Sequence, residues 1–97
     1  MKNVVLKEKS YIHNDEYYYQ IIRKNIKRFR LSRGLTQQDL ADMTDLSREY
    51  ICDIENESRN KHLTIAVLGR IADAMNINIV NFFIMEKKKR KEVTPSK

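Results

Sequence analysis

The stretch LTQQDLADMTDLSREYICDIENESRN, residues 35–60, determines the fold of this chain of 97 residues. It contains two short segments with apolar side chains at helical spacing, and only about three residues separate them. Thr36 is placed to cap the first segment, with Asp39 at the spacing of a capping box, and Ser47 is placed to cap the second. We therefore predict two short helices joined by a tight turn within residues 37–56.

Three further helices are predicted around this pair. One spans about residues 16–33, with Asn14 or Asp15 as its cap and Gly34 at the left-handed position after its end. Another follows Thr64, and a short, nearly all-apolar one covers residues 78–85. Helical spacing assigns the following side chains to the core: Ile22, Ile26, Phe29, Leu40, Ala41, Met43, Leu46, Ile51, Ile54, Ile65, Leu68, Ile71, Ala72 and Met75.

The composition fits one compact, all-α domain of five helices. Glycine and proline number only 2 and 1, which leaves little turn chemistry for hairpins. We place the domain at residues 16–85, between a flexible N-terminal arm at residues 1–15 and a basic, disordered tail at residues 86–97. Within the fourth helix, Gly69 is expected to permit the close approach of another helix; the alternative is a position that merely tolerates glycine.

Several classes of protein are excluded by what the sequence lacks. No run approaches the roughly 20 apolar residues of a spanning helix, and no secretory signal is present, so we expect a cytoplasmic protein without membrane contacts. The single cysteine cannot form an internal disulfide, and one cysteine with two distant histidines does not make a metal site. There is no Gly-rich phosphate loop and no supported pair of nucleophile and base. We therefore expect no enzyme, cofactor, metal or small-molecule ligand.

The positive charge is concentrated in two blocks. The net charge is +6. Residues 20–33 contain six basic side chains and no acidic one, on the face of the predicted first helix opposite its apolar face, and residues 87–91 are all basic. This distribution indicates a polyanionic partner. The tail has two interpretations of equal weight, a solubilising end or a second contact with nucleic acid.

The central pair of helices has the geometry of a helix-turn-helix. A short first helix lets the two cross at about 90–120°, so that the second can enter a major groove. The segments RLSRGLTQ (residues 30–37), Leu40–Ala41, SREYICDIEN (residues 47–56) and LGRIADAMNI (residues 68–77) resemble the Cro and phage-repressor type of domain, the Xre family. The resemblance covers about residues 22–83. Within the family, the REYI and IEN.SRN patterns are similar to those of restriction–modification controller proteins, and phage repressors fit nearly as well.

This resemblance implies a lambda-repressor-like domain that binds double-stranded operator DNA and regulates transcription. One departure is Asp45, where the family usually has glycine in the turn; aspartate tolerates the left-handed conformation better than most residues. The second helix of the pair would be the recognition helix. With Ile51 and Ile54 facing inward, the residues expected to contact bases are Arg48, Glu49, Cys52 and Asp53.

Each of these side chains has a defined chemistry toward a base. Arg48 can donate two hydrogen bonds to guanine, while Glu49 and Asp53 can accept from the amino group of cytosine. Glu49 could equally serve only as a favourable charge at a helix amino end. Contacts to the DNA backbone are expected from Thr36, Gln37, Ser47, Tyr50, Arg59, Asn60 and Lys61.

Two further sets of residues are expected to hold the assembly together. In phage repressors an ion pair joins the positions of Arg30 and Glu55; the alternative is two separate surface charges. The last helix is apolar on too many sides to be covered by one domain, which predicts a homodimer on a palindromic operator. Its expected interface residues are Ile79, Phe82, Phe83 and Met85. The alternative function is an antitoxin or protein-interaction module whose DNA binding is autoregulatory.

Overall fold

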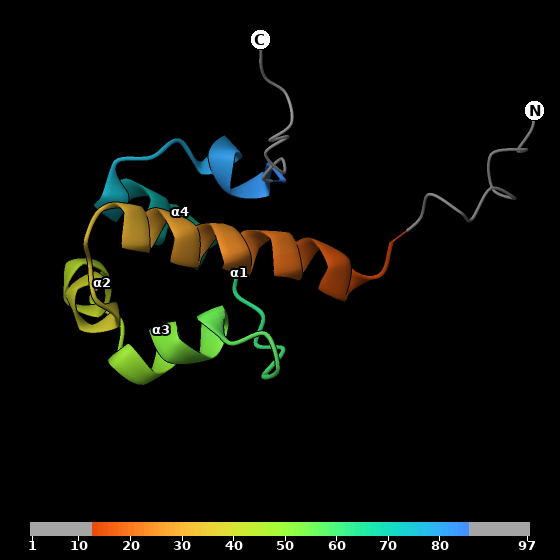
Figure 1. Cartoon of the computed structure of the whole chain (residues 1–97), viewed down its shortest axis with the longest axis horizontal. Helices are drawn as coiled ribbons and strands as arrows, with labels where there is room; N and C mark the ends of the chain where they lie inside the picture. The colour runs from red at the N-terminus through yellow and green to blue at the C-terminus, as the bar shows by residue number, and fades with distance from the viewer. Residues whose placement is uncertain (1–12, 86–97) are drawn as a thin grey trace, which may run out of the picture.

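The structure is a computed structural model that describes residues 13–85, and within them it consists of four α-helices and a short 3₁₀ helix, without strands (Figure 1). The elements in chain order are α1 (Asp15–Ser32), α2 (Gln37–Thr44), α3 (Arg48–Glu55), α4 (Ile65–Met75) and η3 (Ile79–Phe83). The prediction of an all-helical fold is confirmed. No helix in this part of the chain is long and apolar enough to cross a membrane. The predicted tail at residues 86–97 and most of the predicted arm lie outside the described residues.

The fifth helix of the prediction is wrong in type. The segment after α4 is a 3₁₀ helix of 5 residues, not an α-helix over residues 78–85. The Asn25 amide of α1 donates to the carbonyl oxygens of Phe82 and Ile84, at 2.8 and 3.0 Å. These carbonyls are thus satisfied by a side chain and not by a following helical turn, which accounts for the early end of the segment.

The predicted caps set the helix boundaries. The side chains of Asn14, Thr36, Ser47 and Thr64 each accept a hydrogen bond from the backbone N–H three residues on. Thr36 also forms the complete capping box, because the carboxylate of Asp39 accepts from the backbone N–H of Thr36 at 2.9 Å. With Asn14 as the cap, α1 begins one residue before the predicted start.

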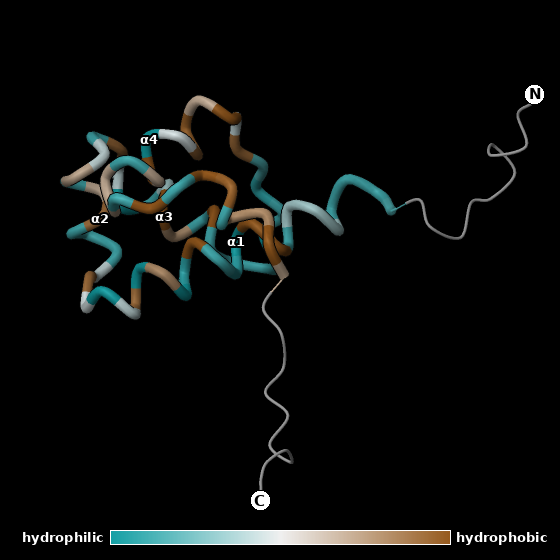
Figure 2. Tube along the Cα trace, turned by 90° about the horizontal axis from the view of Figure 1, so that it is seen from above, coloured by the Kyte–Doolittle hydropathy of each residue, from teal (hydrophilic) through white to brown (hydrophobic). Residues whose placement is uncertain are grey.

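The core lies where the four helices and η3 meet, with α2 packed at the end where α1 finishes (Figure 1). Apolar and polar residues alternate within each helix along the trace (Figure 2), as expected for helices that pack on one side. The buried apolar residues are Ile22, Ile26, Leu40, Ala41, Ile51, Ile54, Leu63, Leu68, Ile71, Ala72, Met75 and Phe82.

Three details of the predicted core are wrong. Met43 is 48% exposed, because Thr44 occupies the inward position of α2 and donates its hydroxyl to the carbonyl of Leu40. Ile65 is 66% exposed, since it is the first residue of α4 and precedes the turn that packs. A Cβ atom on Gly69 would meet nothing within 4 Å, so no helix approaches closely there.

Candidate nucleic-acid interface

The turn between α2 and α3 consists of three residues and closes without glycine. Asp45 adopts the left-handed conformation, with φ of 61° and ψ of 37°, as the departure from the family pattern required. The N–H of Leu46 donates to the carbonyl of Ala41 at 3.0 Å, and Ala41 itself is fully buried where the helices touch. The two helices are therefore fixed relative to each other through backbone hydrogen bonds and a small buried side chain.

The outer face of α3 carries the four residues predicted to contact bases, at two levels of exposure. Arg48 and Glu49, in the first turn, are exposed. Cys52 and Asp53, one turn further, are half-buried. On the opposite side, Ile51 and Ile54 have no exposed surface. The apolar side of α3 therefore packs on the core. Its amino-terminal turn exposes the charged side chains of Arg48 and Glu49 to solvent.

The carboxylate of Asp53 is paired within the chain. The guanidinium of Arg59, in the loop after α3, lies 3.1 Å from it. The Arg59 side chain is 60% exposed and that of Asp53 30% exposed, so the pair lies at the surface. Two residues predicted separately, one for bases and one for the backbone, are therefore brought together, which the sequence spacing did not indicate.

Arg30 of α1 and Glu55 at the end of α3 form a buried ion pair. Two hydrogen bonds of 2.7 and 2.9 Å join the guanidinium to the two carboxylate oxygens. The hydrogen bonds to Glu55 raise the pKa of Arg30 further above its ordinary value, against the opposing effect of burial. Gln37, expected at the DNA backbone, donates to the same carboxylate at 3.2 Å. The alternative of two separate surface charges is excluded.

Arg23, which was predicted to lie on the basic face of the first helix, has a structural role. Its side chain is 1% exposed, and it donates to the carbonyls of Ile54 and Lys61, both at 3.3 Å. A third bond of 3.1 Å reaches Glu16. Arg30 is likewise 6% exposed, so neither arginine belongs to the solvent-facing charge of α1. The partners that bury Arg23 are backbone carbonyls far along the chain, so no local signal in the sequence identifies it.

Glu16 connects this network to the loop that follows α3. It accepts hydrogen bonds from Gln20 at 2.6 Å and from Arg23, and its other oxygen lies 3.2 Å from His62. The His62 ring stacks on Tyr19 with centroids 3.9 Å apart. Partial desolvation alone would raise the pKa of Glu16, but the hydrogen bonds from His62 and Gln20 and the charges of Arg23 and His62 outweigh it and lower the pKa.

The remaining residues predicted at the DNA backbone lie at the helix starts and in the loop. Thr36 and Ser47 are exposed N-caps of α2 and α3. Tyr50 is half-buried, its pKa is raised by burial, and the Lys61 ammonium lies 5.4 Å from the centre of its ring. Asn60 is exposed in a left-handed conformation, with φ of 52°.

The predicted dimer residues do not form one exposed set. Phe82 has no exposed surface and packs edge-on against Phe29, with ring centroids 5.0 Å apart, so it belongs to the core of the domain. Ile79 is half-buried, while Phe83 and Met85 are 46% and 53% exposed. Val80 and Ile84, which the prediction omitted, are 58% and 53% exposed.

Comparisons with known proteins agree with this geometry. The profile of the helix-turn-helix family HTH_3 matches residues 26–82, more than half of the chain. The control protein C.SmaI of Serratia marcescens is 32% identical over 60 residues, which are 62% of this chain and 69% of that protein. The immunity repressor of Bacillus phage phi105 is 38% identical over 58 residues, 60% of this chain but only 39% of the repressor. The crystal structure of the restriction–modification controller protein C.Esp1396I superposes with a TM-score of 0.62 and 36% identity, covering 69% of this chain and 83% of that one.

Proposed function

This chain belongs to the helix-turn-helix family HTH_3, and from that premise we propose that it is a transcriptional regulator that binds a specific operator in double-stranded DNA. The observation that supports the proposal is that α3 packs on the core by one side and exposes its first turn. Ile51 and Ile54 are fully buried beneath it, while Arg48 and Glu49 stand exposed at its amino end. A helix held in this way can lie in the major groove with its first turn against the base edges.

Sequence would be read mainly by the first turn of α3. An arginine can donate two hydrogen bonds to O6 and N7 of one guanine, and such a pair provides about 1–3 kcal/mol of discrimination. We assign this role to Arg48. Glu49 would accept from a cytosine amino group or act only as a favourable charge at the helix start. Cys52 and Asp53 lie one turn further along α3 and are half-buried. They would contact bases only if the helix lies close to the floor of the major groove.

The backbone of the same half-site would be held at the two ends of the helix pair. The starts of α2 and α3 offer backbone N–H groups and the side chains of Thr36, Gln37 and Ser47. The loop after α3 offers Arg59, Asn60 and Lys61, beside Tyr50. These contacts fix the register of the protein on the duplex and do not distinguish sequences.

The relatives indicate the kind of regulation. C.SmaI and C.Esp1396I are named as control or controller proteins, and the phi105 protein as an immunity repressor. We propose that this chain likewise acts by occupying an operator near a promoter, with residues 16–85 as the DNA-binding domain.

We further propose a homodimer, since two half-sites about one helical turn apart double the contacts with DNA. The surface is the apolar end of the domain, formed by Val80, Phe83, Ile84 and Met85. Sedimentation velocity tests this step: Phe83→Asp should convert the dimer to a monomer, and Met43→Asp, at an exposed apolar position on α2, should leave it a dimer. A monomeric wild type would contradict the proposal.

Selection of binding sites from random duplexes tests the function itself. We expect enrichment of a palindrome whose half-sites are about one helical turn apart. If no sequence is enriched and the protein does not bind DNA at low salt, the regulator proposal is wrong. The exposed apolar end would then be the place to seek a protein partner, as the antitoxin alternative requires.

A further inference from the structure

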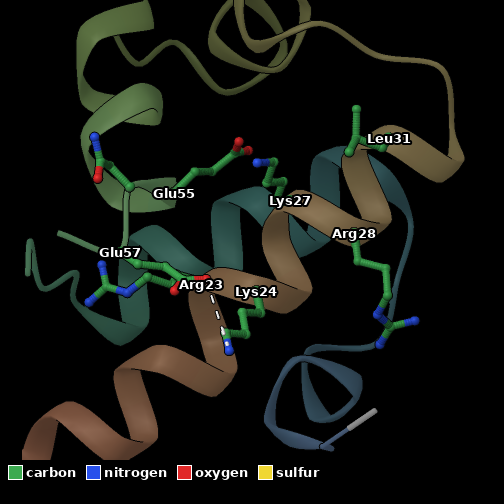
Figure 3. Close-up of a pocket in the computed structure, with 8 residues that line it drawn as sticks. Arg23, Lys24, Lys27, Arg28, Leu31, Glu55 and Glu57 are labelled. Carbon is green, nitrogen blue, oxygen red and sulfur yellow. Dashed lines mark ion pairs between the residues drawn. The ribbon is translucent and has the colours of Figure 1, made fainter. Parts of the chain in front are cut away.

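A groove of about 520 Å³ runs between α1 and the end of α3 (Figure 3). One wall is the middle of α1, and the other is the last residue of α3 with the two residues that follow it. The lining residues are Arg23, Lys24, Lys27, Arg28, Leu31, Glu55, Asn56 and Glu57. None of the residues expected to contact the DNA backbone lines this groove.

Two of the charged side chains in the wall are neutralised by ion pairs within the protein, and a third is turned away from the groove. Glu55 is bound by Arg30, and its side chain is only 3% exposed. Arg23 is bound to Glu16. Arg28 extends from the groove toward η3 in Figure 3 and donates to Asn25 at 2.7 Å. The charges that face the open groove are therefore the ammonium groups of two lysines and one glutamate carboxylate.

The two lysines, Lys24 and Lys27, are exposed and lie one helical turn apart on α1. Lys27 points across the groove toward Glu55 in Figure 3, and it has no ion pair with any of the residues 13–85. Lys24 lies 3.9 Å from Glu57, with both side chains at least 60% exposed. Such an exposed, long pair contributes little and is readily exchanged for another anion. The groove thus presents two cations that an anionic ligand can bind.

We infer that this groove holds the DNA backbone next to the half-site read by α3, with Lys24 and Lys27 each neutralising one phosphate. The inference rests on the proposed function and extends its contact surface to α1. Position supports a DNA backbone as the occupant, because Glu55 and Asn56 in the wall are the last residue and the C-cap of the recognition helix. A strand bordering the major groove that α3 enters passes the ends of that helix. The amide of Asn56, in the same wall, is a further donor for a phosphate oxygen.

The test is a set of fluorescence anisotropy titrations of the full chain with a labelled random-sequence duplex and with the selected operator, over a series of KCl concentrations. Each phosphate contact contributes about 0.9 to the slope of log K against log salt. Lys27→Gln should lower the slope by about 0.9, and Lys24→Gln with Lys27→Gln by about twice that, on both duplexes equally. Glu57→Gln should tighten binding, because it removes the competing carboxylate.

The matched control is Arg70→Gln on α4. It removes one positive charge and retains a donor for the carbonyl of Thr44, with which Arg70 bonds at 2.9 Å. This variant should keep the wild-type slope.

If the double lysine variant also keeps that slope while the wild type binds DNA, the inference is wrong, the proposed function stands, and an acidic protein surface becomes the occupant to test. If Arg70→Gln lowers the slope as much as Lys27→Gln, the effect is one of net charge and the groove is not a phosphate site. If the wild type binds neither duplex, both proposals fail.

Discussion

The guanidinium of Arg30 holds the carboxylate of Glu55 through two hydrogen bonds of 2.7 and 2.9 Å, and so fixes the end of α3 against α1. Both side chains are less than 10% exposed. The third hydrogen bond to this carboxylate comes from Gln37, the first residue of α2. One buried carboxylate therefore joins three helices, and the angle at which α3 is presented depends on it.

Removal of Glu55 should be strongly destabilising. Glu55→Ala leaves the Arg30 guanidinium buried without its counter-charge, which typically costs about 3–5 kcal/mol in the free energy of unfolding. Urea denaturation followed by circular dichroism measures this cost. The double variant Arg30→Met with Glu55→Leu should be less destabilised than Glu55→Ala, since it leaves no stranded charge. A cost of about 1 kcal/mol or less for Glu55→Ala would show that the pair does not hold α3.

The capping box of α2 gives a second prediction. Thr36→Ala removes the acceptor for the N–H of Asp39, at 2.9 Å, and should lower the free energy of unfolding by about 1 kcal/mol. Thr36→Ser keeps the hydroxyl and should remain close to wild type in the same denaturation experiment. Equal losses in the two variants would mean that the methyl group, and not the cap, is responsible.

The ion pair between Asp53 and Arg59 bears on DNA affinity. Asp53→Asn removes a negative charge from the proposed DNA-binding surface and releases the Arg59 guanidinium, now 3.1 Å from the carboxylate. We expect tighter binding to specific and random duplexes alike, measured by anisotropy, and a salt slope increased by up to about 0.9. A loss of affinity confined to the operator would instead identify Asp53 as a residue that reads a base.

The network around Glu16 predicts a dependence of stability on pH. Its folded-state pKa is lowered, so its contribution is fully present above the ordinary glutamate pKa of about 4.3 and is lost as the pH falls through the lower, folded-state value. Urea midpoints of wild type and Glu16→Gln should therefore converge on acidification through this range. Parallel pH profiles for the two proteins would rule out a contribution from Glu16.

Local signals in the sequence were sufficient for most of the fold. Thr36, Ser47 and Thr64 mark helix starts because a side-chain oxygen there satisfies a free backbone N–H, an interaction that depends on neighbouring residues alone. The last segment was predicted wrongly because its end is set by Asn25, whose amide donates to a carbonyl 57 residues away in the chain. Tertiary contacts of this kind leave no periodicity to detect.

In the candidate site, too, positions set by local spacing could be predicted and positions set by tertiary contacts could not. The outward position of Arg48 follows from helical spacing once Ile51 and Ile54 face inward. The burial of Arg23 does not, because its partners are backbone carbonyls 31 and 38 residues away. A basic residue within a charged block is ordinarily solvated, and only the packing of the loop after α3 over α1 makes this one structural.

To test whether the first turn of α3 reads the operator, wild type and Arg48→Ala are titrated with the selected operator and with duplexes in which each guanine of the half-site is replaced in turn. At one guanine the wild type should lose about 1–3 kcal/mol of binding free energy, and Arg48→Ala should bind the original and the altered duplex equally. If Arg48→Ala keeps the wild-type discrimination at every guanine, Arg48 does not read the operator, and the proposed recognition of DNA by the first turn of α3 is wrong.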